Sequence, residues 1–251
     1  MPLPFNCRQY NTKVIIMSQD LSRSANRLLS SLPKDEYERL EPYLTLVSLP
    51  RGTVCYEASD EIKTIYFPLT ALVSLVNTLS SGATTEVSLV GGTGMIGLSA
   101  ILGSGISQNR AIVQVSDNLM KISAEILKQE FRRGGELQNI MHRYIETRLS
   151  EITQLAVCNA HHTIEERLAR WLLVTSDLIQ SNNLPLTQEF LSSMLGVRRS
   201  GVTLAAQTIQ RAGLITYRRG KIIILNREAL ENTSCECYQL FYDNFYRQYP
   251  M

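Results

Sequence analysis

The sequence predicts an α+β protein with a β-rich N-terminal part, a long connecting helix and a C-terminal winged helix-turn-helix. Residues 46–122 consist of short β-branched and aromatic runs separated by turn residues, a pattern typical of strands. Residues 137–156 carry apolar side chains at helical spacing, and residues 184–225 contain two more helical patterns followed by a hairpin pattern. The chain has 251 residues, 44% of them hydrophobic, which is enough for two modest cores.

The N-terminal segment, residues 1–24, shows no apolar periodicity, and we expect a flexible tail in which Met17 resembles an alternative natural start. Apolar residues at helical spacing on both sides of Pro33 predict two short helices, because proline interrupts a helix. The longest apolar run near the N-terminus is too short for a signal segment or a membrane span. We therefore expect a cytoplasmic protein with no membrane partner.

The β-rich region, residues 46–122, is punctuated by turn residues such as Gly52, Gly82 and Gly91. Turns at this regular spacing favour a sandwich or a barrel. Short strands of this kind occur in many folds, so their periodicity alone does not identify which fold is present.

The long helical pattern predicts a helix that packs along its full length. Two interpretations stay open: the helix covers its own β region, or it pairs with the same helix of a second subunit. A new helix is expected to start at Thr163, whose spacing to Glu166 forms a capping box. The apolar positions of the long helix are Leu137, Ile140, Met141, Tyr144, Leu149, Ile152, Leu155 and Ala156.

The helix-turn-helix pattern begins at Thr187, whose hydroxyl can cap a helix that runs to about Leu195. Gly196 then supplies the left-handed turn residue, and a second helix begins near Arg198. The buried face of this second helix is expected to consist of small and branched residues at helical spacing, namely Val202, Ala205, Ala206 and Ile209.

The hairpin pattern after Gly213 forms a basic wing, residues 214–225. Residues 184–227 contain seven cations and one acid, so this window carries about +6 whereas the whole chain carries +2. Positive charge concentrated on a winged helix-turn-helix predicts binding to double-stranded DNA. The alternative is a winged helix that mainly mediates protein contacts.

These residues resemble the DNA-binding domain of the cyclic-AMP receptor protein and fumarate-nitrate regulator (Crp/Fnr) family, and the resemblance extends over residues 25–230. It implies a homodimer, with RNA polymerase as a further expected partner, and it places Thr163 near the hinge between sensor and reader. The implied parts are a tail at 1–24, a cyclic-nucleotide-binding-like β-roll sensor domain at 25–135, a dimerisation helix at 136–160, a winged helix-turn-helix at 161–232 and a tail helix at 233–251. The residues expected in the dimer interface are Ile140, Tyr144, Leu149, Ile152 and Leu155.

The resemblance also implies which residues contact DNA, with departures from the family pattern at two of them. Ser200 stands where the family has a glutamate and Leu204 where it has a second arginine, so we expect a different operator, an inverted repeat with one guanine contact per half-site. Base contacts are expected from Arg199, Ser200, Thr203 and Leu204. Phosphate contacts are expected from Thr187, Arg198, Arg218, Arg219 and Lys221.

The effector pocket implied by the resemblance departs further from the family pattern. Met95 replaces the glutamate that holds a ribose, and Asn109 replaces the arginine that pairs with a cyclic phosphate. Arg110 follows one residue later, and a shift of one residue along a strand points a side chain to the opposite face. We therefore expect an effector other than cyclic AMP, or none. The residues expected in this pocket are Gly94, Met95, Gly97, Leu98, Asn109, Arg110 and Ala111.

No cofactor is predicted. An iron–sulfur cluster needs four thiolates, but only Cys7 and Cys55 precede residue 60, and all histidines lie beyond the β region, where a haem or metal in the roll would need them. Cys235 and Cys237 form either a metal or redox pair or part of a tail helix without nearby histidines, whereas His161 and His162 are expected to mark a helix junction. Catalysis is not expected, because the chain has no phosphate-cradling Gly-Lys motif and no histidine near a candidate nucleophile.

Overall fold

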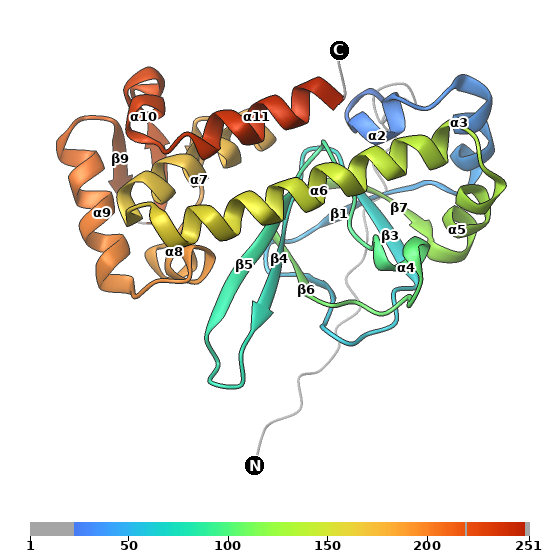
Figure 1. Ribbon diagram of the computed structural model, residues 1–251, viewed down its shortest axis with the longest axis horizontal. Coiled ribbons are helices and arrows are strands. Elements are labelled where there is room, and N and C mark those ends of the chain that lie inside the picture. The colour runs from blue at the N-terminus through green and yellow to red at the C-terminus, as the bar shows by residue number, and fades with distance from the viewer. Residues whose placement is uncertain (1–22, 219, 249–251) are drawn as a thin grey trace.

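A computed structural model describes residues 23–218 and 220–248 (Figure 1). The predicted N-terminal tail up to residue 22, the alternative start at Met17 and the phosphate contact of Arg219 therefore lie outside the described residues. Figure 1 shows a β-sheet lobe and a mostly helical lobe, both lying against the long helix α6 (Glu136–His161). The predicted α+β class and the order of its parts are confirmed.

Two short helices precede the strands, as the interruption at Pro33 predicted: α2 (Arg27–Ser30) and α3 (Lys34–Leu40). Asn26 caps α2, and its side-chain amide also donates to the carbonyl oxygens of Pro68 and Gly94, which attaches the helix to the β region. Chain order continues with η1 (Glu41–Tyr43), β1 (Thr45–Leu49), β2 (Val54–Tyr56), β3 (Thr64–Pro68), β4 (Leu72–Thr78), β5 (Thr84–Val90), α4 (Ser99–Leu102), β6 (Arg110–Val115), β7 (Asp117–Ser123) and α5 (Ala124–Arg133).

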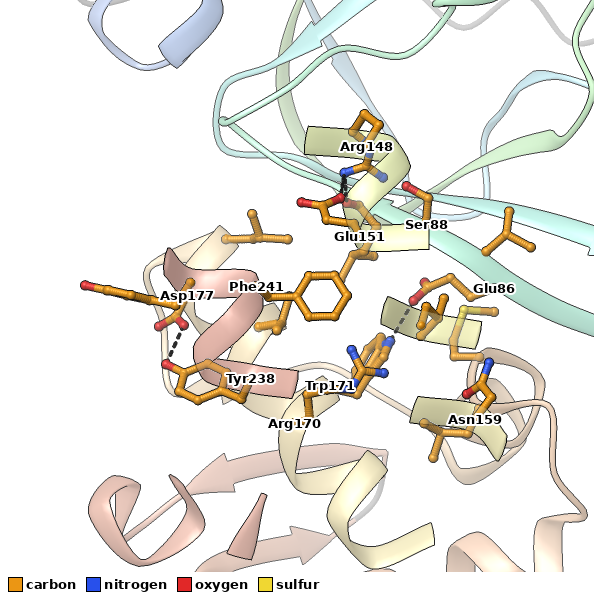
Figure 2. Close-up of a pocket in the computed structure, with 18 of the residues that line it drawn as sticks. Glu86, Ser88, Arg148, Glu151, Asn159, Arg170, Trp171, Asp177, Tyr238 and Phe241 are labelled. Atoms are coloured by element: carbon orange, nitrogen blue, oxygen red, sulfur yellow. Dashed lines mark hydrogen bonds and ion pairs between the residues drawn. The ribbon is translucent and has the colours of Figure 1, made fainter. Parts of the chain in front are cut away.

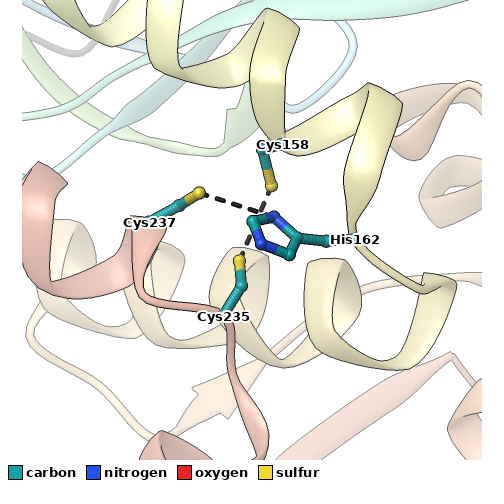
Figure 3. A group of neighbouring side chains, drawn as sticks. All are labelled: Cys158, His162, Cys235 and Cys237. Carbon is teal, nitrogen blue, oxygen red and sulfur yellow. Dashed lines mark hydrogen bonds between the residues drawn. The ribbon is translucent and has the colours of Figure 1, made fainter.

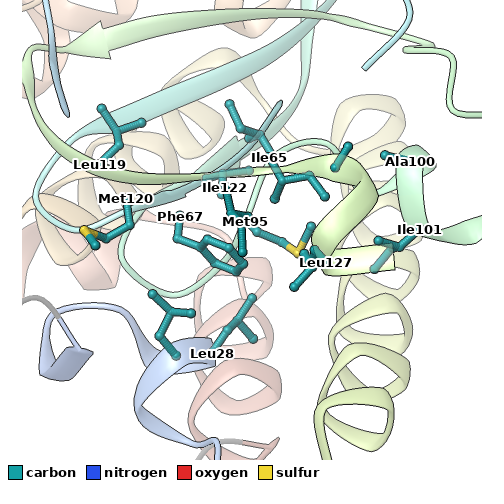
Figure 4. Packing of buried hydrophobic residues seen from close by; sticks show 14 of the residues in the cluster. Leu28, Ile65, Phe67, Met95, Ala100, Ile101, Leu119, Met120, Ile122 and Leu127 are labelled. Atoms are coloured by element: carbon teal, nitrogen blue, oxygen red, sulfur yellow. The ribbon is translucent and has the colours of Figure 1, made fainter. Parts of the chain in front are cut away.

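Within the described part of the chain, seven strands form the β-roll from two antiparallel sheets, with strand orders β1-β7-β3 and β2-β6-β4-β5. Their inward side chains alternate along the strands and fill the interior, where Ile65, Phe67 and Leu119 are almost completely buried. Figure 4 shows these side chains packed together with Met95 and with Leu127 of α5. The interior of the roll is therefore an apolar core.

Helix α6 behaves differently in its two halves. Ile140 and Tyr144 in its first half are buried in the core of the roll, so the prediction that they form a dimer interface is wrong. Leu149 and Ile152 in its second half are 62% and 47% exposed. The interpretation that α6 covers its own roll therefore holds for the first half, because the apolar stripe changes its angular position along the helix.

The C-terminal lobe begins at α7 (Ile164–Ile179), which starts with the predicted capping box of Thr163 and Glu166. Its core is formed by α7, the helix-turn-helix and the wing, with Leu172, Leu191 and Val202 fully buried. The remaining elements are β8 (Asn183–Leu184), α8 (Gln188–Leu195), α9 (Arg199–Arg211), β9 (Ile215–Arg218), β10 (Lys221–Ile224), α10 (Arg227–Thr233) and α11 (Cys237–Gln248). Strand β8 adds a third strand to the wing, in the order β8-β10-β9.

None of the described helices combines the length and the apolar character that crossing a bilayer requires.

Candidate nucleic-acid interface

The turn between α8 and α9 has the geometry that the sequence predicted. The Thr187 hydroxyl accepts a hydrogen bond from the Phe190 amide at 3.2 Å and caps α8. Gly196 ends α8 with a φ of 64°, and a Cβ at this position would also lie 2.9 Å from Oγ1 of Thr85 on β5. Glycine is required here by the left-handed backbone and by the close approach of the β-roll.

Helix α9 presents its first turn and one face to solvent. Arg198, the N-cap residue, and Arg199 and Ser200 in the first turn are exposed, and Leu204 one turn later is 60% exposed. The opposite face, with Val202, Ala205, Ala206 and Ile209, is buried against the C-terminal core, as predicted. The exposed face of α9 is therefore free of the protein's own core.

Thr203, also predicted to contact bases, forms side-chain hydrogen bonds within the protein. It is half-buried, and its hydroxyl donates to the carbonyl oxygen of Arg199 at 2.9 Å and lies 3.2 Å from Oε1 of Gln188. Thr203 thus links α9 to the first turn of α8. In this arrangement its hydroxyl stabilises the position of the recognition face.

The wing lies beside the start of α9. Arg218 and Lys221 are paired across the hairpin of β9 and β10, and both are exposed. A shallow hollow between the wing and the two helices is lined by Thr187, Gln188, Arg199, Tyr217 and Gly220. A hydroxyl, an amide and a guanidinium around one hollow form a surface that suits an anionic oxygen.

Arg227 contributes to the positive charge of the window in the sequence but not to this surface. Its guanidinium donates to Asp177 of α7 at 2.6 Å and to Glu231 at 2.8 Å, within its own helix α10. The Tyr238 hydroxyl donates to the same Asp177 carboxylate at 2.8 Å. Arg227 therefore attaches α10 to α7, and the net charge available to a polyanion is smaller than the sequence count.

The predicted effector pocket of the β-roll is filled by the protein's own side chains. Met95 is 2% exposed and lies in the core of the roll. The Tyr144 hydroxyl of α6 donates to the carbonyl oxygen of Met95 at 2.9 Å and accepts from its amide at 3.1 Å. A Cβ on Gly94 would lie 2.5 Å from that hydroxyl, and one on Gly97 would lie 3.0 Å from the Ile65 side chain. Tyr144 thus occupies the site that the resemblance assigned to a ligand.

The other predicted pocket residues point in two directions. Ala111 is fully buried, whereas Arg110, which pairs with Val76 of β4, forms an ion pair with Glu57 at 3.3 Å on the outer side of the sheet. The predicted change of face between neighbouring strand residues is therefore confirmed. The Asn109 side chain donates to Asn77 at 2.6 Å, also at an exposed position, and Leu98 packs against the core of the roll.

The outer face of the β4-β6 sheet forms the interface with the C-terminal lobe. Val76 belongs to the C-terminal core, and Leu89 and Ile112 pack against it. A cavity of about 100 Å³ lies in this interface between β5, α6, α7, α8 and α11 (Figure 2). Its polar lining residues include Glu86, Ser88, Thr93, Arg148, Glu151, Asn159, Arg170, Asp177 and Tyr238. This volume is well below the roughly 300–1,000 Å³ of pockets for drug-sized ligands.

Glu86 is the buried acid of this interface. Its carboxylate accepts from the Trp171 indole N–H at 2.8 Å and from the Ser74 hydroxyl at 2.5 Å, as Figure 2 shows for Trp171. Burial raises the pKa of Glu86 to about 7, against the opposing effects of these two hydrogen bonds and of Arg170 and Arg148. The acid therefore titrates near neutral pH while it connects β5 to α7.

The role of Glu86 could not be found from strand alternation. Leu75 pairs with Ser88 and Val76 pairs with Glu86, which leaves Val87 as an extra residue in β5. Such a bulge re-aims the side chains beyond it. Glu86 consequently lies opposite Val76, on the face that contacts the C-terminal lobe.

Arg148 and Glu151 form a second charged group of the interface, one turn apart on α6. Their side chains form an ion pair (Figure 2), and both are mostly buried. Burial raises the pKa of Glu151, and Arg148 opposes that shift. The interface thus contains charges that are paired inside the protein.

One expectation about the C-terminal cysteines is wrong. Nδ1 of His162 lies 3.6 Å from Sγ of Cys237, so a histidine is close to the Cys235-x-Cys237 pair. Sequence reasoning missed it because the two segments are separated by more than 70 residues and meet only where α6 ends and α11 begins.

Comparisons with known proteins agree with this architecture. Residues 166–233 match the family model of the Crp-like helix-turn-helix domain. The global nitrogen regulator of Synechococcus elongatus is 22% identical over 198 residues, which cover 74% of this chain and 88% of that protein. A putative Crp/Fnr-family regulator from Eubacterium rectale has the same fold, with a TM-score of 0.67, 21% identity, and coverage of 84% of this chain and 98% of that chain. A c-di-GMP-responsive global regulator of Xanthomonas campestris matches with a TM-score of 0.64 and 17% identity, over 76% and 99% of the two chains.

Proposed function

We propose that this chain is a transcription regulator of the Crp/Fnr type that binds an inverted-repeat DNA operator as a homodimer, and the match of residues 166–233 to the Crp-like helix-turn-helix domain supports the proposal. The observation that carries the proposal is the start of α9, where Arg198 and Arg199 are exposed next to a basic wing. An exposed helix N-terminus with two arginines fits the major groove and its flanking phosphates.

Within this surface we assign different roles to the cations. Arg199 is the base-reading residue, because it lies in the first turn of α9 and a guanidinium can pair with guanine through two hydrogen bonds. Arg198, Arg218, Lys221 and Thr187 contact phosphates, which position the helix without reading sequence. Ser200 and Leu204 face the same groove and permit several bases there.

Selection of binding sites from a random DNA pool tests these roles. Arg199→Ala should relax the preference at one base pair per half-site, since one such pair contributes about 1–3 kcal/mol of discrimination. Arg218→Ala should weaken binding to all sequences and reduce the salt dependence of log K by about two per dimer. Arg132→Ala is the matched control, an exposed arginine on α5 of the β-roll, and should change neither. If Arg199→Ala selects the same motif as the wild type, the role of Arg199 is refuted. If the wild-type protein binds none of the DNA in the pool, a protein partner such as RNA polymerase is favoured instead.

We propose that the exposed second half of α6 holds the dimer together. Leu149, Ile152 and Ala156 follow one another at spacings of three and four on the exposed side of the helix. Parallel pairing of this stripe with a second copy would place two recognition helices about 34 Å apart, one turn of DNA. Leu155, by contrast, lines the interdomain cavity of its own subunit.

Sedimentation velocity tests the stripe. Ile152→Asp should convert a dimer into monomers, because an unpaired carboxylate would be buried between the two helices. Leu102→Asp, at an apolar residue of α4 that is 52% exposed, is the matched control and should remain dimeric. A wild-type protein that is monomeric at micromolar concentration refutes the proposed interface.

We infer that the effector, where one acts, is not cyclic AMP. The interior of the β-roll is occupied by Met95 and Tyr144, and Arg110 lies on the outer face beside Glu57. Isothermal calorimetry with cyclic AMP should give a dissociation constant weaker than about 1 mM, since the charged partners that contribute roughly 1.5–3 kcal/mol each are absent from the interior. Micromolar binding would overturn the inference and would require Tyr144 to leave its position.

A further inference from the structure

Four side chains with metal-binding atoms meet where α6 ends and α11 begins. Cys158 and His162 are one turn apart at the end of α6, and Cys235 and Cys237 flank Glu236 at the start of the C-terminal segment (Figure 3). The three cysteines are buried and His162 is half-buried. All three are free thiols, and the four donor atoms lie within 4.8 Å of one another.

Two of the distances between the donor atoms match the edges of a tetrahedral zinc site, and the others are at most 4.8 Å. Sγ of Cys158 and Sγ of Cys235 are 3.6 Å apart, and Nδ1 of His162 is 3.6 Å from Sγ of Cys237. A zinc ion bound at its usual lengths holds two thiolates about 3.8 Å apart, and a thiolate and an imidazole nitrogen about 3.6 Å apart. A disulfide needs sulfurs at about 2.0 Å, so the thiols are not joined.

The surroundings are those of a metal site. Oε2 of Glu236 lies 3.1 Å from Nε2 of His162, on the ring nitrogen opposite the thiols, and this contact orients Nδ1 toward them. The side-chain amide of Gln154 donates to Sγ of Cys237 at 3.0 Å. Arg170 interacts electrostatically with Cys158 and Cys235, and its charge would balance the single net negative charge that three thiolates leave around a divalent zinc ion.

We propose that Cys158, His162, Cys235 and Cys237 form a zinc site that ties the C-terminal end of α6 to the start of α11. Three thiolates and one imidazole in a tetrahedron are a ligand set of structural zinc sites. All four positions are supplied by protein, so the site is closed. An iron–sulfur cluster would divide the four ligands between two or more irons, so not all of their donor atoms would lie within 4.8 Å of one another.

The site lies at the junction of α6, α7 and α11. His162 is the residue immediately before Thr163, the cap of α7, and α11 packs against both α6 and α7. Tyr238 and Phe241 of α11 line the interdomain cavity. The ion therefore holds α11, which closes this cavity, and it fixes the junction between α6 and α7 of the C-terminal lobe.

Metal content and cobalt binding of the purified full-length protein test the proposal without reference to DNA. Protein purified under reducing conditions should contain about one zinc per chain, and cobalt added after zinc removal should give the visible absorption of a tetrahedral site with thiolate charge-transfer bands. Cys158→Ser and Cys237→Ser should each weaken cobalt binding by roughly 100-fold or more, the scale expected when one of four ligands is lost. Glu236→Gln, which keeps all four ligands, should weaken it about 10-fold.

Cys55→Ala is the matched control, because Cys55 lies in β2 of the β-roll and its removal leaves all four ligands in place. It should retain full metal content. A wild-type protein that holds no zinc and gives no tetrahedral cobalt spectrum overturns the proposal, as does iron with acid-labile sulfide, or a Cys158–Cys235 disulfide in freshly prepared protein. Because these measurements are made on the wild type, they decide the question even if a cysteine variant fails to fold.

Discussion

The interior of the β-roll and the interface between the two lobes use the same strands in opposite ways. Inward side chains of β3 and β6, such as Ile65 and Ala111, form an apolar core that is closed by Tyr144. Outward side chains of β4 and β5 meet buried charged groups and a cavity of about 100 Å³. The comparison teaches that the buried carboxylate and guanidinium groups of Glu86, Glu151 and Arg148 lie between the two lobes, whereas the described core of the roll is mainly apolar.

The physical reason is the difference in polar partners. Tyr144 satisfies both backbone polar groups of Met95, so the interior of the roll contains few polar atoms that need a ligand. The interface contains Glu86, Arg148 and Arg170, which are stabilised by one another and by hydrogen bonds across the lobes. Charges buried at such a boundary couple the relative position of the lobes to protonation.

The largest loss of stability is expected where a charge is placed in the core of the roll. Met95→Glu should lower the free energy of unfolding by about 4 kcal/mol at neutral pH, because a carboxyl in this apolar core must be neutral and its pKa must rise by about 3 units. Urea denaturation measures this loss. Met95→Leu, a change of similar volume, should cost less than about 1.5 kcal/mol. Equal stabilities of Met95→Glu and Met95→Leu would show that the interior is open to water.

The second prediction concerns how the stability of the folded protein depends on pH through Glu86 in the interface. Glu86 has a pKa of about 7 in the folded protein against 4.5 in the unfolded chain, so the folded state binds its proton more tightly. The resulting stabilisation is complete below pH 4.5 and is lost as the pH rises to about 7, a change of roughly 3 kcal/mol from this group.

Denaturation at several pH values, with Glu86→Gln as the comparison, isolates this contribution. The glutamine side chain can still accept from Trp171 but does not titrate, so the decline between pH 4.5 and 7 should be smaller in the variant. Identical pH profiles for the two proteins would show that Glu86 is not buried against α7.

A third prediction addresses the link between the lobes. Trp171→Phe retains the ring in the C-terminal core but removes the N–H that donates to Glu86. Stability should fall by roughly 1–3 kcal/mol above pH 7, where the carboxylate is ionised, and by less at pH 5. A double-mutant cycle with Glu86→Leu, which has no acceptor for this N–H, measures the coupling, and additive losses would argue against a direct hydrogen bond.

The smallest effect is expected at the closure of the roll. Tyr144→Phe removes the hydroxyl that binds both backbone groups of Met95, and it should cost about 1 kcal/mol or somewhat more in thermal or urea unfolding. His142→Phe, at an exposed position of the same helix, is a control for helix propensity and should be nearly neutral. A stabilising Tyr144→Phe would show that the hydroxyl is not needed to close the site.

Much of the C-terminal domain could be predicted because its signals are local. The cap at Thr187, the left-handed Gly196 and the buried face of α9 all depend on residues within a few positions of one another. Helix α6 was predicted along its whole length, but the side facing the roll and the side left exposed were not separated. An apolar stripe fits a helix that covers its own roll as well as a helix that pairs with a second subunit. Only the packing of Tyr144 against Met95 shows which part of α6 faces the roll.

The amino-acid sequence by itself determined the order of the elements, the caps and turns of the DNA-binding domain, and the loss of the charged partners at Met95 and Asn109. The order, caps and turns follow from spacing over one or two helical turns, whereas the missing charged partners follow from the resemblance to the Crp/Fnr family. Only the tertiary structure decided that Glu86 meets Trp171 across 85 positions and that Cys158 meets Cys235 across 77. Such contacts depend on a bulge in one strand and on the path of a terminal helix, neither of which has a local signal in the chain.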